Sequence, residues 1–112
     1  MKRGEIYFAD LSPTVGSEIN KRRPVLIVSN DANNRASSTV TVLPLTSSIA
    51  RVYPFEVLLA AQQCGLPKDS KAMAQQIRTI PKDRLHPGKA GELDRDLMRR
   101  IDAAIRLHLA LA

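Results

Sequence analysis

Three consecutive cations, Lys21, Arg22 and Arg23, form the densest basic cluster of the chain and stand directly before Pro24. The continuous apolar run Val25–Val28 follows and is typical of a strand buried on both faces. Because Arg23 adjoins that strand, the strand fixes the direction of its side chain. A guanidinium offers forked donors that match two phosphate oxygens, whereas a charge run at a loop end is otherwise a solvated edge. The cluster therefore predicts either a phosphate contact or an exposed loop.

A second candidate loop carries the hydroxyl groups of Thr46, Ser47 and Ser48. Hydroxyl clusters in loops most often satisfy local backbone groups as caps and turns. However, the chain has no acidic residue between Asp31 and Glu56, so a phosphate would not be repelled near these hydroxyls. The loop is a candidate for binding the backbone of a nucleic acid.

Further side chains could contact RNA from other segments. Ser17 and Glu18 lie together in a predicted loop, where an isolated glutamate is usually only solvated. Alternation puts Gln76 and Arg78 on one face of a predicted strand, where amide and guanidinium groups could reach bases and phosphates or simply face solvent. Tyr53, beside a proline in a loop, is the aromatic residue most free to stack on a base.

The sequence lacks the residue patterns that several other kinds of catalytic or binding site need. Cys64 has no base near it in sequence, and His86 and His108 lie in a turn and on a predicted helix, so no acid–base pair of histidines is visible. The carboxylates are scattered without the short spacing that a Mg²⁺ site needs, and there is no glycine-rich phosphate loop. The sequence predicts neither a metal nor an organic cofactor.

The composition agrees with a basic, globular, single-domain protein. The chain has 112 residues, is 44% hydrophobic and 25% charged, and carries 17 Lys and Arg against 11 Asp and Glu, a net charge of +6. We expect one domain over residues 1–112, with a polyanion, foremost nucleic acid, as its partner. A single cysteine, the lack of an apolar run long enough for a membrane span and the lack of a signal peptide favour the cytoplasm and no membrane contact.

Short apolar segments separated by turns predict a protein rich in strands. We expect strands at residues 5–11, 25–28, 38–43, 55–59, 71–74 and 76–80, with Pro44 ending the third and a polar loop over 30–38. After the turn at 86–88 the apolar period changes to 3.6, and residues 93, 97, 101, 105 and 109 form one stripe of a terminal amphipathic helix. Many strands followed by one helix predict a mainly β fold with α structure, in which the helix covers a small, strongly bent barrel.

Taken in order, these segments resemble the MazF/PemK-type toxins, the ribonuclease halves of bacterial toxin–antitoxin pairs. The resemblance covers almost the whole chain. It runs through RGEIY (3–7), DLSPTVGSE (10–18), RPVLIVSN (23–30), VLPLTS (42–47), YPFEV (53–57), QIRTI (76–80) and the closing Leu-rich helix.

The resemblance implies an SH3-like small barrel of the MazF/Kid/CcdB type, closed by the C-terminal helix. It also implies a metal-independent, sequence-specific endoribonuclease that acts as a homodimer on single-stranded RNA and is inhibited by a cognate antitoxin. Arg23 falls on the catalytic arginine of the family, Thr46 on its catalytic threonine and Glu18 on a glutamate with a supporting role in some members. Another branch uses a loop histidine, an arginine and an aspartate, and where these would stand this chain has Ser17, Met73 and Gln75. The histidine mechanism is therefore not expected.

Elementary chemistry is compatible with this residue set. If the ribose 2′-hydroxyl is the nucleophile, the products are a 2′,3′-cyclic phosphate and a 5′-hydroxyl, and the protein must stabilise the charge of the phosphorane. Arg23 and Thr46 suit that role. For the general base, Glu18 and an Arg23 of perturbed pKa are both open, since an arginine is normally protonated. The predicted RNA contacts beyond these residues are Ser17, Lys21, Arg22, Ser47, Ser48, Tyr53, Gln76 and Arg78.

Two other functions remain open from the sequence. The same barrel could serve a non-catalytic toxin that binds a protein target such as DNA gyrase, although Arg23 and Thr46 would then have no phosphate to stabilise. The composition alone would also permit a basic RNA-binding module without chemistry.

Overall fold

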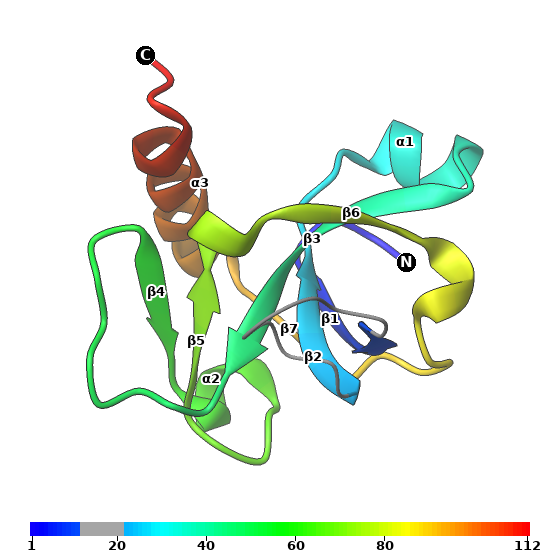
Figure 1. The fold of residues 1–112 in the computed structure, drawn as a ribbon. Helices are drawn as coiled ribbons and strands as arrows, with labels where there is room; N and C mark the ends of the chain where they lie inside the picture. The colour runs from blue at the N-terminus through cyan, green and yellow to red at the C-terminus, as the bar shows by residue number, and fades with distance from the viewer. Residues whose placement is uncertain (12–21) are drawn as a thin grey trace.

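Strand β3 (Thr39–Thr46) is the element around which the sheet is organised (Figure 1). The computed structural model describes residues 1–11 and 22–112. β2 (Arg22–Ile27) pairs with one edge of β3, while β6 (Arg78–Pro81) and β5 (Ser70–Met73) share the opposite edge in succession. All three pairings are antiparallel, so β3 connects two parts of one bent sheet.

The remaining elements extend this sheet or cover it. Strands β4, β5, β3, β2, β1 and β7 are neighbours in that order. The elements not yet given bounds are β1 (Glu5–Asp10), α1 (Asp31–Ala36), β4 (Glu56–Leu59), α2 (Ala61–Cys64), the 3₁₀ helices η1 (Ala74–Gln76) and η2 (Lys82–Arg84), β7 (Gly91–Glu92) and α3 (Arg95–Leu109).

The sheet curls far enough for the segment after β6 to meet β1. Beyond β6 and η2, Leu85 forms an isolated antiparallel bridge with Ala9 of β1. The backbone N–H of His86 also donates to the carbonyl oxygen of Phe8 at 2.8 Å. These contacts close β1, β2, β3 and β6 into the small barrel that the sequence predicted.

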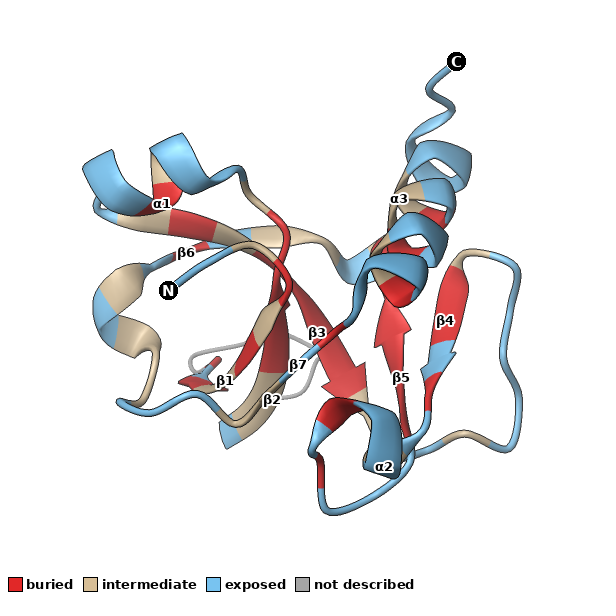
Figure 2. Cartoon of the chain, turned by 180° about the vertical axis from the view of Figure 1, so that it is seen from behind, coloured by how far each residue is buried: buried red, intermediate tan, exposed pale blue. Residues whose placement is uncertain are grey.

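Two buried clusters lie on opposite faces of the same strands (Figure 2). Val25 and Ile27 face the barrel interior, and Leu26 and Val28 face the other way, because successive strand residues point to opposite faces. The prediction that the run Val25–Val28 is buried on both faces is confirmed. The interior cluster consists of Ala9, Leu11, Val25, Ile27, Val40, Val42 and Ile80.

Helix α3 covers the second cluster. Asp94 caps its N-terminus by accepting a hydrogen bond from the Leu97 N–H at 2.8 Å. Leu97, Ile101 and Ala104 are buried against the sheet, whereas Leu109 is 46% exposed. The predicted apolar stripe is therefore wrong for Leu109, because the C-terminal end of α3 projects past the sheet (Figure 1).

Three predicted boundaries differ from the structure. Pro44 does not end its strand but lies buried inside β3, between the residues that pair with β6 and those that pair with β5; a residue without N–H interrupts a ladder least where the strand changes partner. Residues 31–36 lie in the segment that the sequence predicts as a polar loop, in which a helical turn is open, and they form the six-residue helix α1. Arg23 is not at a loop end but within β2, paired with Ala9.

Candidate active site

The pairing of β2 with β3 brings together the two residues that the sequence singled out for phosphate chemistry. Val25 is the register partner of Pro44, and the same antiparallel register continued by two residues sets Arg23 opposite Thr46. Both side chains line one cleft of about 310 Å³. The strands, and not the intervening sequence, therefore assemble this pair.

The cleft is polar and cationic. Arg22, Arg23 and Lys68 contribute positive charge, and none of its described lining residues is acidic. Its lining consists of Phe8, Arg22, Arg23, Pro24, Leu45, Thr46, Ser47, Ser48, Leu66, Pro67, Lys68 and Ser70. Such a surface attracts an anion and does not repel a phosphodiester.

Arg23 carries positive charge on the β2 side of Thr46. Its side chain is half-buried, and within residues 1–11 and 22–112 no hydrogen bond or ion pair engages its guanidinium. Burial lowers the pKa of Arg23 below its usual value, because desolvation disfavours the charged form. A desolvated guanidinium with open donors is suited to bind two oxygens of a phosphate.

Thr46 presents its hydroxyl group with a defined orientation. Its Oγ1 accepts a hydrogen bond from the Ser48 N–H at 3.2 Å, which occupies one lone pair and leaves the hydroxyl hydrogen able to donate. Ser47 and Ser48 are exposed beside it. This hydroxyl is thus able to act as a second donor to a phosphate bound at Arg23.

Two further cations stand at the cleft. Arg22 lies over the ring of Phe8, with the guanidinium carbon 4.9 Å from the ring centroid. Lys68 was missed by the sequence analysis. Its position just before the predicted strand at 71–74 was the available signal, since a strand end presents its neighbouring side chains at the edge of the sheet.

The other predicted RNA contacts lie outside this cleft. Gln76 and Arg78 line a separate pocket of about 410 Å³ with Gln75 and Ile77. Gln76 belongs to η1 and not to a strand, so the prediction that alternation aligns it with Arg78 on one strand face is wrong. The 3₁₀ turn takes the chain from β5 to β6, two partners of the same β3 edge, and interrupts the alternation.

Tyr53 lies in the loop between β3 and β4. Its ring is stacked on Phe55 with centroids 5.5 Å apart and planes 7° apart, and it is 42% exposed. The Arg51 guanidinium donates to the Tyr53 hydroxyl at 3.0 Å. The ring is thus stacked on one aromatic neighbour and partly accessible, and the Arg51 guanidinium carbon and Lys71 Nζ lie 5.8 and 5.9 Å from its centroid. Its stacking on an RNA base stays a prediction. Ser17, Glu18 and Lys21 fall outside the described residues.

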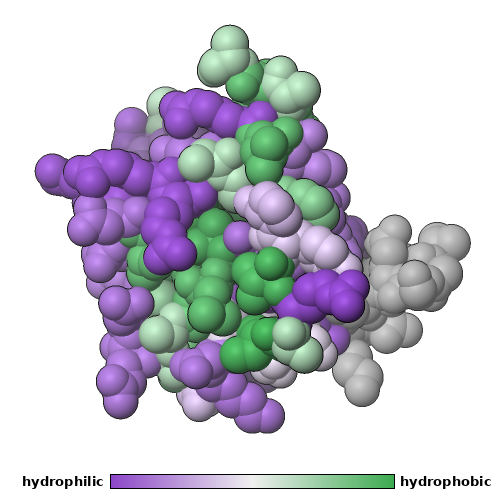
Figure 3. Space-filling view, turned by 90° about the vertical axis from the view of Figure 1, so that its left-hand side faces the viewer, coloured by the Kyte–Doolittle hydropathy of each residue, from purple (hydrophilic) through white to green (hydrophobic). Residues whose placement is uncertain are grey.

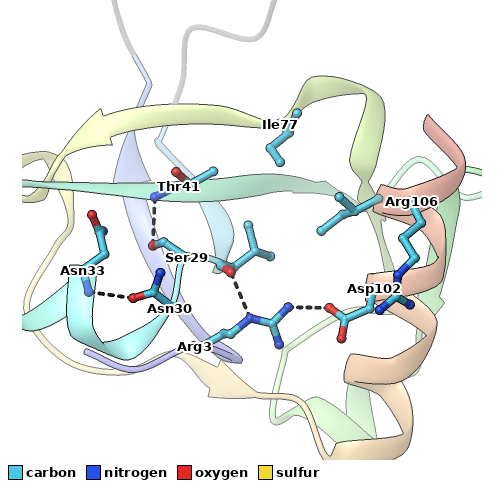
Figure 4. A pocket seen from close by; sticks show the side chains of 10 residues that line it. Arg3, Ser29, Asn30, Asn33, Thr41, Ile77, Asp102 and Arg106 are labelled. Carbon is cyan, nitrogen blue, oxygen red and sulfur yellow. Dashed lines mark hydrogen bonds and ion pairs between the residues drawn. The ribbon is translucent and has the colours of Figure 1, made fainter. Parts of the chain in front are cut away.

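A larger hollow of about 600 Å³ lies between α1, β3 and α3 (Figure 4). Arg3 points into it, but its guanidinium donates to the Val28 carbonyl oxygen at 2.9 Å and forms an ion pair with Asp102. The charge of Arg3 is therefore used to fasten the N-terminal segment to α3. The hollow is also lined by Arg106 and by the acidic Asp102, whereas the cleft at Arg23 has no acidic residue among its described lining residues.

The described part of the chain contains no cluster of three or more His, Cys, Asp or Glu side chains able to hold a metal ion. Cys64 is buried, and burial raises the pKa of its thiol, as does the nearby charge of Asp94. No helix among the described residues has the length and apolarity required to cross a bilayer.

Residues 2–109 match the family model described as "PemK-like, MazF-like toxin of type II toxin-antitoxin system". The chain is 46% identical over 117 residues to Endoribonuclease MazF9 of Mycobacterium tuberculosis, covering 99% of this chain and 98% of that one. It is 45% identical over 112 residues to Endoribonuclease EndoA of Bacillus subtilis, covering 99% and 96%. A solved mycobacterial endoribonuclease in complex with its cognate antitoxin superposes with a TM-score of 0.81 at 30% identity, over 100% of this chain and 97% of that one.

Proposed function

We propose that this chain, which belongs to the PemK-like, MazF-like family of type II toxins, is an endoribonuclease that cleaves single-stranded RNA without a metal ion. The observation that carries the proposal is the Arg23 guanidinium, half-buried and without a partner among the described residues, opposite Thr46 in a cationic cleft. An arginine desolvated for structural reasons alone would be expected to have a carboxylate or carbonyl partner, as Arg3 does.

In the proposed reaction the ribose 2′-hydroxyl loses its proton and attacks the adjacent phosphorus, and the 5′-oxygen of the next nucleotide leaves and takes up a proton. The products are a 2′,3′-cyclic phosphate and a 5′-hydroxyl. Arg23 donates to the non-bridging oxygens, on which negative charge grows in the phosphorane, and Thr46 adds a further donor. Preorganised donors of this kind supply much of the rate enhancement in charged transition states.

The proton of the 2′-hydroxyl needs an acceptor. Glu18, outside the described residues, is one candidate; Arg23, whose pKa is lowered by burial, is the other. A Glu18→Gln variant distinguishes them, because loss of the base at Glu18 removes the acidic limb of the pH–rate profile while an Arg23 base leaves it unchanged.

The proposed RNA path extends from the cleft to both sides. Arg22 and Lys21 contact the backbone, Ser47 and Ser48 border the scissile phosphate, and Tyr53, Gln76 and Arg78, with Ser17, contact bases or flanking phosphates. Three separate groups of side chains suit a substrate several nucleotides long.

The proposed protein partners are a cognate antitoxin and a second copy of this chain. A solved relative is described in complex with its antitoxin. Figure 3 displays apolar side chains on the side of the molecule where β4 and α3 lie. Among the exposed large apolar residues, Leu58 belongs to β4 and Leu107 and Leu109 belong to α3, and they are exposed by 44%, 57% and 46%. Exposed apolar patches of this kind favour a protein–protein contact. We propose that the toxin works in the cytoplasm as a homodimer.

One experiment tests the activity. Purified protein is incubated with a long single-stranded RNA in EDTA, and the fragments are separated and their ends analysed. Discrete fragments with cyclic phosphate and 5′-hydroxyl ends support the proposal, and a folded Arg23→Ala protein is the control. Intact RNA would overturn it; inhibition of DNA gyrase by the same preparation would then identify the non-catalytic alternative, and RNA binding alone a module without chemistry.

A further inference from the structure

A buried ion pair lies beside the connection of residues 47–55 between β3 and β4, which we call the Tyr53 loop. The pair does not belong to the residues used in the proposed reaction. Glu56, the first residue of β4, and Lys71 of β5 are 7% and 8% exposed, and Lys71 Nζ lies 2.8 Å from Glu56 Oε1. Lys71 is the register partner of Thr46 on one side and of Leu58 on the other. The pair therefore sits one strand away from the proposed catalytic threonine.

Both charges hold the backbone of the loop between β3 and β4. Lys71 Nζ donates to the Arg51 carbonyl oxygen at 2.7 Å. Glu56 Oε1 accepts from the Tyr53 N–H at 3.0 Å, and the Glu56 N–H donates to the Tyr53 carbonyl oxygen at 2.9 Å. Both backbone groups of Tyr53 are thus fixed by one residue, within a connection that has no strand or helix of its own over residues 47–55 (the long green loop on the left of Figure 1).

The same carboxylate reaches a second segment proposed to contact RNA. Glu56 Oε2 accepts from Gln75 Nε2 at 2.7 Å, and Gln75 directly precedes Gln76 in η1. Burial alone would raise the pKa of Glu56, but the hydrogen bonds from Lys71, from the Tyr53 N–H and from Gln75 outweigh it and lower the pKa. The charged carboxylate of Glu56 therefore connects the Tyr53 loop to η1 through hydrogen bonds.

Stability alone does not account for this arrangement. A buried ion pair contributes little compared with apolar residues of the same volume, because desolvation offsets the attraction. What an apolar pair could not do is bind the N–H and C=O groups of an irregular loop. Through these bonds the loop holds the Tyr53 ring, which is stacked on Phe55 and 42% exposed.

We propose that the buried Glu56–Lys71 pair is a positioning device for substrate: it fixes the Tyr53 loop so that the Tyr53 ring forms a stacking surface for an RNA base that flanks the scissile phosphate. The proposal rests on the proposed function, since it concerns the same RNA. Glu56 and Lys71 do not touch the substrate. They act through Tyr53, and the strength of base stacking on that ring is the quantity they control.

The test is a mutational cycle between the pair and Tyr53. The probe is an RNA oligonucleotide of about ten nucleotides around the mapped cut, with a 2′-O-methyl group at the cut that removes the nucleophile. The variants are Tyr53→Ala, the isosteric double variant Glu56→Gln/Lys71→Met, and the triple variant. The matched control is Lys89→Met/Glu92→Gln, which alters a Lys–Glu pair exposed by 41% and 63% on β7 and the turn before it.

We expect Tyr53→Ala to weaken binding of the probe by roughly tenfold, the contribution of one base stacked on an aromatic ring. The double variant should lose nearly as much, and the triple variant should bind no more weakly than Tyr53→Ala, because the pair acts through the ring. With cleavable RNA the double variant should raise KM while kcat stays within about twofold, since stacking holds substrate and transition state alike. The control should bind like the parent.

Two outcomes overturn the proposal: parental affinity in the double variant, or a triple variant whose loss is the product of the two separate losses. Thermal unfolding is recorded for every variant. Should the double variant fail to fold, the single variant Glu56→Gln takes its place in the cycle, because it keeps the volume and the Lys71–Arg51 hydrogen bond. A parent protein that neither binds nor cuts RNA contradicts the proposed function instead, so the two failures are distinguishable.

Discussion

Two neighbouring regions of this molecule treat charge in opposite ways. In the cleft, Arg23 is half-buried and open, without a hydrogen-bond partner among the described residues. One strand farther along, Glu56 and Lys71 are almost completely buried, and Glu56 alone accepts three hydrogen bonds from side chains and backbone. Both regions are held by β3, through β2 on one edge and β5 on the other.

In this small basic domain some charged groups stabilise the structure and others remain available to bind a ligand. A charge whose hydrogen-bonding capacity is filled within the protein has nothing left for a ligand, but it can hold a loop in place. A charge left open costs stability and is useful only when an anion arrives. Removing a charge should therefore affect folding at the Glu56–Lys71 pair and activity in the cleft.

The largest expected effect is on stability, at Lys71. The substitution Lys71→Met leaves the buried Glu56 carboxylate without its cation, and the free energy of unfolding should fall by about 3–5 kcal/mol. Adding Glu56→Gln should restore most of that loss, because the remaining groups are neutral. Denaturant unfolding measures both, with Lys89→Met as an exposed control that should change little. A Lys71→Met protein of parental stability would mean that the pair is not structural.

The second prediction concerns activity at Arg23. Arg23→Ala should lower the rate of RNA cleavage by about 10²–10³-fold, the usual cost of losing one preorganised donor. The melting temperature should not fall, since the guanidinium makes no described hydrogen bond. Arg99→Ala, which changes an exposed arginine paired with Asp96 on α3, should keep full activity. A folded Arg23→Ala protein that cuts normally would remove Arg23 from the mechanism.

A smaller effect is expected from the cations that border the cleft. RNA binding should weaken with salt, and the log–log slope should decrease by about 0.7 for each phosphate contact removed on a single strand. Arg22→Ala and Lys68→Ala should each show this decrease, whereas Arg99→Ala should not. Binding of the non-cleavable oligonucleotide from low to moderate salt measures the slope. If both variants keep the salt dependence of the parent protein, Arg22 and Lys68 face solvent and do not contact phosphates.

The smallest expected effect is a pH dependence at Glu56. Because its folded pKa is lowered, its contribution to stability is complete above the unfolded pKa of about 4.3 and is lost as the pH falls toward the folded value. The parent should therefore lose stability below pH 4.3 more steeply than Glu56→Gln. Urea midpoints between pH 6 and pH 3 test this, and parallel curves for the two proteins would contradict it.

The elements with a clear apolar period were predictable from local sequence. The apolar segment at residues 5–11, the continuous run Val25–Val28 and the 3.6-residue period of α3 each reflect which side chains must leave water, and all three elements are present. The predictions were wrong at residues where strand pairing, and not the local sequence pattern, determined the structure. Pro44 continues β3 because the strand changes partner there, and Gln76 turns in η1 because the chain must pass from β5 to β6.

The sequence by itself determined a basic, strand-rich domain with a terminal amphipathic helix, and it offered the cations at 21–23 and the hydroxyl groups at 46–48 as phosphate contacts, among which the family resemblance pointed to Arg23 and Thr46. Only the tertiary structure decided that these two stand opposite each other, that Lys68 joins them, and that Glu56 and Lys71 form a buried pair. The physical reason is that period and composition act over a few neighbouring residues. The register of β3 with β2 and β5 pairs residues that are 15 to 27 positions apart in the chain, and it sets which side chains are desolvated together.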